Sequence, residues 1–216
     1  MPGEAIGSLA NLAYFFASAN LFTPGGIPSA FANLVNLEEL GLKGTRRFGS
    51  IPSFLGDLTK LVFLDLDDNS LVGPLPAELS KLSDLEFLLL NRNDLSGEIP
   101  VEFAALTSLR VAFFENNNLF GSLAPLCSLS TFNEPLGDVD GRELLIHDCL
   151  IEGTNTGVVC ECCTSCCSPQ DPNCNPYTAI PNLDPIWEYL YDRFEFTFGN
   201  EAVYIAQDYL GLPPGI

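Results

Sequence analysis

The sequence predicts an α/β repeat solenoid, in which short coils of chain stack on one another. Ile27-Pro28, Ile51-Pro52, Leu75-Pro76 and Ile99-Pro100 stand 24 residues apart, and Leu123 follows one period later. A ladder of leucines returns at the same interval before each of the later pairs. A fixed period of this size is typical of solenoids whose coils contact only their neighbours, and such folds present long binding surfaces.

Each coil is expected to carry one short strand of a shared parallel sheet. In the third coil Leu64 and Leu66 alternate with Phe63, Asp65 and Asp67, which is the period-two pattern of a strand with one buried face. The leucines should point into the solenoid, so the alternating residues should lie on the outer, concave face of the sheet.

An asparagine ends this strand in three successive coils, at Asn69, Asn93 and Asn117. We expect a structural role for all three, because a carboxamide can satisfy the backbone donors and acceptors left over where a chain turns. Gly73 and its equivalents follow where the backbone needs conformational freedom.

The back of each coil is expected to be a loop or a short 3₁₀ turn rather than a long helix. The apolar residues that should plug the core from this side keep the same period: Phe31, Leu55, Leu79 and Phe103.

The first two coils depart from the repeat. The first has one extra residue around positions 23–26, which predicts a bulged loop. The second has Thr45 at the asparagine position and Arg47 in place of a leucine, so Phe48 is predicted to turn inward instead. We expect the packing to be looser here.

These positions resemble the plant-type leucine-rich repeat, whose pattern runs Leu-x-x-Leu-x-x-Leu-x-Leu-x-x-Asn-x-Leu-x-Gly-x-Ile-Pro. The match is strongest from about Leu58 to Leu123, although Ala112 and Phe114 replace two leucines. The resemblance implies a right-handed curved solenoid with a concave parallel sheet, used mainly for protein or peptide recognition.

Eight cysteines predict a disulfide-rich C-terminal cap and an oxidising compartment. Zinc is the alternative, since the Cys163 and Cys166 spacing suits a metal site, but adjacent cysteine pairs favour disulfides. The segment 144–167 resembles the cap of leucine-rich repeat proteins of diatoms. The cysteines are Cys127, Cys149, Cys160, Cys162, Cys163, Cys166, Cys167 and Cys174.

The chain therefore divides into a solenoid at 1–126, a cysteine-rich cap at 127–174 and an acidic, aromatic tail at 175–216. In the tail, residues 194–198 alternate as a strand would, and Asp184-Pro185 could open a short helix. The tail is expected to pack on the cap or on the back of the solenoid, with partner binding as the alternative.

The net charge of −19 disfavours binding to nucleic acid or to anionic membranes. The uncharged stretch 5–37 follows the repeat, so we do not interpret it as a membrane span. We expect an N-terminal cap and a secretion signal to precede Met1, and an extracellular or cell-surface location.

No catalytic motif accompanies His147, the single histidine, so neither an enzyme nor a cofactor is predicted. The expected function is recognition of a protein or peptide on the concave face, where an apolar stripe is flanked by acids. Alternatives are an inhibitor of a secreted hydrolase, the sensing part of a larger receptor or receptor kinase, and a wall or matrix protein; the oligomeric state stays open. The candidate contact residues are Phe63, Asp65, Asp67, Phe87, Leu89, Asn91, Val111, Phe113 and Glu115.

Overall fold

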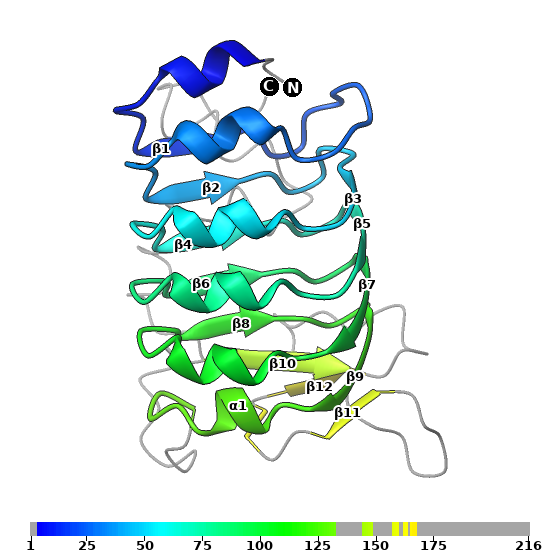
Figure 1. The fold of residues 1–216 in the computed structure, drawn as a ribbon. Coiled ribbons are helices and arrows are strands. Elements are labelled where there is room, and N and C mark those ends of the chain that lie inside the picture. Colours follow the sequence, from blue (N-terminus) through cyan, green and yellow to red (C-terminus); the bar gives the residue numbers. More distant parts are fainter. Residues whose placement is uncertain (1–3, 133–143, 149–156, 160–161, 164, 168–216) are drawn as a thin grey trace, which may run out of the picture.

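The computed structural model describes residues 4–132, 144–148, 157–159, 162–163 and 165–167. Within them the chain winds through stacked coils, each contributing one strand to a parallel sheet (Figure 1). This is the α/β repeat solenoid that the 24-residue period predicts.

A seven-stranded parallel sheet runs through all the coils, in the order β1-β2-β4-β6-β8-β10-β12. Phe63 pairs with Phe87, and Phe87 with Val111, so residues one period apart are direct neighbours. The strands are β1 (Tyr14–Phe16), β2 (Glu39–Gly41), β4 (Phe63–Asp65), β6 (Phe87–Leu89), β8 (Val111–Phe113), β10 (Leu144–Asp148) and β12 (Ser165–Cys167).

A second parallel sheet, of five strands in the order β11-β9-β7-β5-β3, forms one flank of the solenoid (Figure 1). Gly73, Gly97 and Gly121 have φ values of 82°, 92° and 94° here, a region that favours glycine. The strands are β3 (Phe48–Gly49), β5 (Ser70–Gly73), β7 (Asp94–Glu98), β9 (Asn118–Ser122) and β11 (Gly157–Val159).

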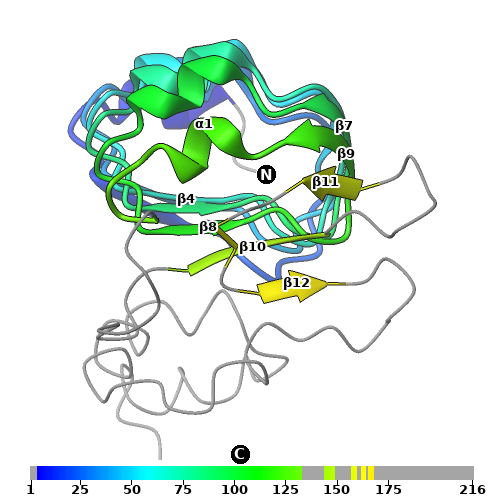
Figure 2. The ribbon, with the colours of Figure 1, turned by 90° about the horizontal axis from the view of Figure 1, so that it is seen from below.

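Short helices cover one side of the seven-stranded sheet (Figure 2), and the prediction of 3₁₀ turns is confirmed. A proline precedes four of them, because its fixed φ suits the entry to a helical turn. Each of these four buries the expected plug residue completely. The helices are the 3₁₀ helices η1 (Glu4–Ser8), η2 (Ser29–Asn33), η3 (Ser53–Asp57), η4 (Ala77–Lys81) and η5 (Val101–Ala105), and α1 (Ala124–Cys127).

The leucines on the inner face of the sheet form one continuous core with the helices. Leu40, Leu64 and Leu88 are fully buried in successive strands, and Ala112 continues the row in β8. The core is thus built by stacking equivalent residues from neighbouring coils.

The strand-ending asparagines join neighbouring coils through hydrogen bonds. Asn93 Nδ2 donates to the carbonyl oxygens of Leu66 (2.9 Å) and Leu90 (3.1 Å), while its Oδ1 accepts from the Leu71 N–H (3.0 Å). Asn69 and Asn117 make equivalent contacts. One side chain therefore satisfies backbone groups of two coils.

The prediction for the second coil is wrong. Arg47 is only 2% exposed, whereas Phe48 is 52% exposed on the flank. The Arg47 guanidinium donates to the carbonyl oxygens of Thr23 (2.6 Å) and Gly26 (3.2 Å), and Nε donates to that of Thr45 (3.0 Å). Because its many donors match the carbonyls of the longer loop, Arg47 holds this region together instead of loosening it.

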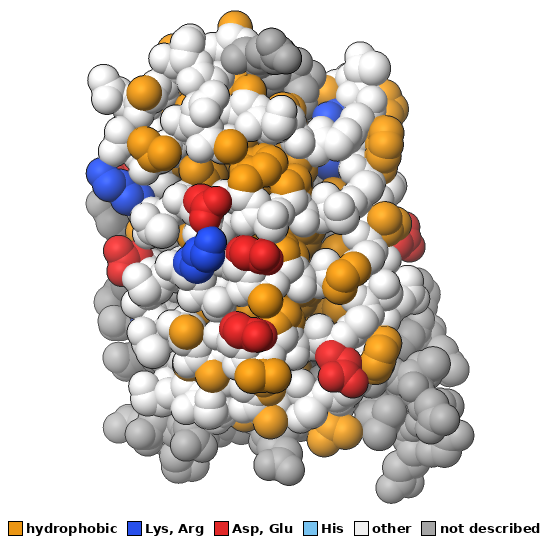
Figure 3. Space-filling model, in the orientation of Figure 1, with side chains coloured by type: hydrophobic (Ala, Val, Ile, Leu, Met, Phe, Trp, Pro, Cys, Tyr) orange, Lys and Arg blue, Asp and Glu red, His pale blue; other side chains and the backbone are white. Residues whose placement is uncertain are grey.

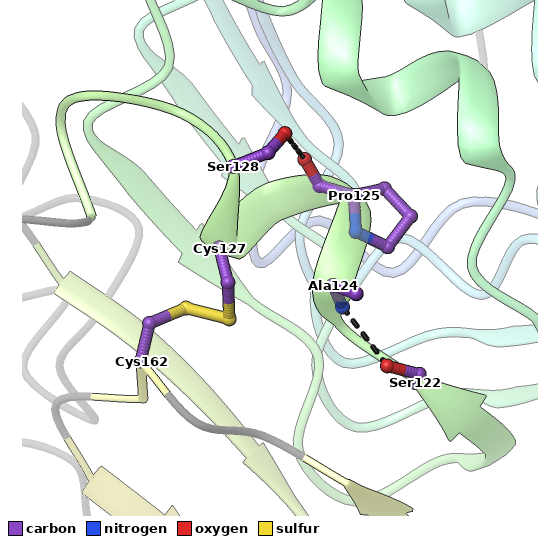
Figure 4. The surroundings of a disulfide bond; sticks show 6 residues. All are labelled: Ser122, Ala124, Pro125, Cys127, Ser128 and Cys162. Atoms are coloured by element: carbon purple, nitrogen blue, oxygen red, sulfur yellow. Dashed lines mark hydrogen bonds between the residues drawn. A yellow bond between two sulfur atoms is a disulfide. The ribbon is translucent and has the colours of Figure 1, made fainter.

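The residues after the last full coil extend both sheets. Strand β10 pairs with β8, β12 pairs with β10, and β11 pairs with β9. A disulfide joins Cys127 in α1 to Cys162 (Figure 4), and Cys163 is also disulfide-bonded. Cys127, Cys162 and Cys163 pack against the leucine core, so this segment covers the end of the solenoid.

Helix α1 crosses the predicted boundary at residue 126, and the three-part division of the chain stays a prediction. Other expectations fall outside the described residues. These are the tail at 175–216 with its strand and helix, and Cys149, Cys160 and Cys174.

Candidate functional site

The candidate site is the outer face of β4, β6 and β8, opposite the leucine core. An outer stripe of apolar side chains lies on it, made of Phe63, Phe87, Leu89, Val111 and Phe113. Its aromatic rings continue into β1, since the ring centroids of Phe16 and Phe63, and of Phe63 and Phe87, are each 5.9 Å apart. The register brings together the apolar residues that the sequence predicts on this face.

The outer stripe is shielded from solvent. Phe63, Leu89, Val111 and Phe113 are fully buried and Phe87 is 7% exposed, yet none of them belongs to the leucine core. Tyr14 and Phe16 on the edge strand β1 remain substantially exposed. The stripe thus forms a second apolar layer, on the side of the sheet away from the described helices (Figure 2).

A row of polar residues borders the outer stripe where the strands end. Asp67, Asn91 and Glu115 occupy equivalent positions in successive coils, and all three are buried. Lys43 Nζ lies 3.3 Å from Asp67 Oδ2, and Arg92 pairs with the same oxygen. Burial raises the pKa of Asp67, while the two cations act in the opposite direction.

Asp65 lies between the apolar stripe and this polar row. Its Oδ1 accepts the Asp67 backbone N–H at 2.9 Å. Burial, and next the charge of Asp67, raise the pKa of Asp65 well above its usual range. Within the described part of the chain, Asp65 Oδ2, Asp67 Oδ1 and both polar atoms of Asn91 have no hydrogen-bond partner.

The described acidic residues of this face are not grouped as metal ligands. Over the described ranges, no three His, Cys, Asp or Glu side chains are placed to hold a metal ion. His147 lies in β10, beside the Phe113 end of β8. The outer face offers apolar contact, hydrogen bonding and ion pairing.

A second apolar surface lies on the flanking sheet, and the sequence interpretation missed it. Phe48, Val72 and Phe120 are each between 45% and 52% exposed, and Val159 continues the group. Figure 3 shows exposed hydrophobic side chains along this flank. The signal was present in the sequence, because Phe48, Val72 and Phe120 stand at multiples of 24 residues.

Comparison with known proteins agrees with this geometry. The sequence profile described as Leucine Rich Repeat matches residues 60–82 and 84–106. This part of the chain carries leucine-rich repeats. The matched residues contain β4, η4, β6 and η5, the centre of the solenoid. Among curated proteins, no sequence matches the chain.

Several solved leucine-rich repeat structures are similar to the chain. The plant peptide hormone receptor RGFR1, in complex with RGF2, is 34% identical over 56% of this chain and 19% of the receptor chain, with a TM-score of 0.54. The Arabidopsis receptor kinase HAESA, in complex with the peptide hormone IDA and the co-receptor SERK1, is 30% identical over 61% of this chain and 22% of its own, with a TM-score of 0.53.

A plant ice-binding protein is similar to the same degree: it is 36% identical over 56% of this chain and 39% of its own, with a TM-score of 0.53. The chain therefore spans less than two thirds of the length of each of these proteins. The same coils occur in proteins with different ligands, so the fold alone does not assign a function. None of the described helices has the length and apolar character of a membrane-spanning segment.

Proposed function

We propose that this chain is a non-enzymatic recognition module that binds a protein or peptide on the outer face of β4, β6 and β8. The observation that carries the proposal is the outer stripe. Its five apolar residues lie outside the leucine core that stabilises the coils. Aromatic and aliphatic side chains held away from water are typical of the centre of an interface.

The receptors among the similar structures support this proposal, because RGFR1 and HAESA are peptide hormone receptors in complex with their ligands. The proposal includes an extracellular or cell-surface location. The disulfide between Cys127 and Cys162 supports it, since such bonds persist in oxidising compartments.

The test is a selection of linear peptides from a random displayed library, using the full-length protein as bait. Peptides that bind should lose affinity for a Phe87→Ala variant by about tenfold or more, because an interface anchor has been truncated. A Val72→Ala variant is the matched control, since Val72 is exposed on the flanking sheet. Equal affinities for the wild type and Phe87→Ala, with a loss for Val72→Ala, would refute the proposed site.

A second candidate is the ligand-sensing part of a larger receptor, favoured by the similarity to receptor structures several times longer than this chain. Sequencing the full-length transcript tests it. A transmembrane and kinase-coding segment in the same reading frame would support it, and a stop codon after Ile216 together with a secretion signal alone would refute it.

A further inference from the structure

We infer that the outer face holds a binding position for a guanidinium group of the ligand, formed by Asp65, Asp67 and Asn91. The ligand class is thus a protein or peptide with an arginine next to its apolar anchor. This inference rests on the proposed function, because it assigns a ligand chemistry to the same surface.

The three side chains lie together on two neighbouring strands. Asp65 and Asp67 are two residues apart, so their side chains share the outer face of the third coil. Asn91 belongs to the fourth coil, and the Asp68 N–H donates to its carbonyl oxygen at 3.2 Å, which fixes the register beyond the paired strands. Asn91 therefore stands beside Asp67 at the end of the outer stripe.

These side chains have unused hydrogen-bonding capacity where water is excluded. Asp65 and Asn91 are fully buried and Asp67 is 1% exposed. Three oxygens, Asp65 Oδ2, Asp67 Oδ1 and Asn91 Oδ1, accept from no described residue, and Asn91 Nδ2 donates to none. Buried polar groups in native proteins normally have partners, so this cluster is the part of the outer face that most requires a ligand.

A guanidinium matches this set better than the other common cations do. It presents several N–H donors in a rigid plane, which suits three acceptors on two strands, whereas an ammonium is a compact point charge. A metal ion is less suitable, since the described residues assemble no group of three metal-ligating side chains. The Asn91 Nδ2 donor would then be available for a backbone carbonyl of the ligand.

The neighbouring cations leave this position available and mark its approach from solvent. Lys43 and Arg92 both contact Asp67 Oδ2, so Asp67 Oδ1 remains directed elsewhere. Their side chains are 12% and 37% exposed, compared with 1% for Asp67.

The test follows the Asn91 side-chain amide of the full-length protein by NMR during titration with L-argininamide. Its resonances should shift and saturate, and an Asp65→Asn variant should weaken binding by about tenfold or more, because the carboxylate that a bound guanidinium would stabilise is replaced by a neutral amide. L-Citrullinamide, which replaces the guanidinium with a neutral urea group, should cause no saturable shift. Asp94→Asn, at an exposed aspartate of β7, is the control variant and should bind as the wild type does.

An unchanged Asn91 signal, equal shifts with L-citrullinamide, or equal losses in Asp65→Asn and Asp94→Asn would overturn the inference. The amide spectrum of Asp65→Asn checks that it folds. Asn91→Leu lacks the observed side-chain amide, so calorimetry measures its binding of L-argininamide, which should also be weaker.

Failure of this inference differs from failure of the proposed function. Library peptides could bind in a way that depends on Phe87 and yet carry no excess of arginine. This result would support the proposed recognition surface and refute the guanidinium position.

Discussion

The two faces of the seven-stranded sheet are built from alternating residues of the same strands, yet only one face repeats the same residue type from coil to coil. On the inner face, Leu64 and Leu88 repeat the same side chain and pack into one core. On the outer face the neighbouring positions change from Asp65 to Leu89 to Phe113. Stacking requires equivalent residues only where coils pack together, so the variable face is the one on which a function can be placed.

The largest difference between the faces should come from truncating an inner leucine. Leu88→Ala removes a fully buried side chain and leaves a cavity, so we expect a loss of about 2–5 kcal/mol in the free energy of unfolding. Denaturant unfolding followed by circular dichroism measures it. Val101→Ala, at a 73% exposed position in η5, should change stability by less than about 0.5 kcal/mol. Equal effects of the two substitutions would mean that the inner face is not the core.

Removing the disulfide at the end of the solenoid should cause the next largest loss of stability. Replacing Cys127 and Cys162 together with alanine removes a disulfide between residues 35 apart in the sequence. We expect a loss of about 2–4 kcal/mol, since the unfolded chain is no longer constrained. Thermal unfolding of both proteins without reductant measures the loss. An unchanged midpoint would show that this bond does not stabilise the last coil.

Two asparagines of one coil separate the structural role from the binding role. Asn93→Leu leaves carbonyl and N–H groups of two coils without partners, and we expect a loss of about 1–3 kcal/mol. Asn91→Leu removes polar atoms that bond to no described residue, so its stability should stay within about 0.5 kcal/mol of the wild type. Urea titrations of both variants measure these two changes in unfolding free energy. A larger loss for Asn91→Leu would reverse the assigned roles.

The smallest expected effect is a pH dependence that arises from Asp65. Because its pKa is raised in the folded state, its stabilising contribution is complete below its unfolded pKa of about 3.9 and is lost as the pH rises through the folded value. Asp65→Asn removes this titration. The variant should therefore gain stability relative to the wild type between acidic and neutral pH. Unfolding free energies of both proteins at several pH values measure this gain, and a constant difference between them would contradict it.

The inner face could be predicted in detail because its cause is local and periodic. Leu64, Leu88 and the plug residues such as Phe103 each repeat a position whose burial is set by the next coil. The same period predicts that Phe63 lies beside Phe87, and the pairing of β4 with β6 confirms it.

Other features depend on contacts that the repeat does not encode. Arg47 is satisfied by carbonyl groups of Thr23 and Gly26, in a loop of another coil, so its own coil gave no sign of its burial. Asp68 and Arg92 adopt φ values of 53° and 52°, although neither residue type prefers this conformation as glycine does.

The candidate site could be predicted in position but not in environment. Burial of the outer stripe depends on what shields the sheet, and no pattern within a coil specifies that. The unpaired atoms of Asp65 and Asn91 become apparent only when their neighbours are placed in space.

A crystal structure of the full-length protein with its tightest selected peptide tests recognition by the outer face most directly. We predict that the peptide crosses β4, β6 and β8 and contacts Phe87 and Phe113. A peptide seated on Phe48, Val72 and Phe120 of the flanking sheet, with the outer stripe untouched, would contradict this.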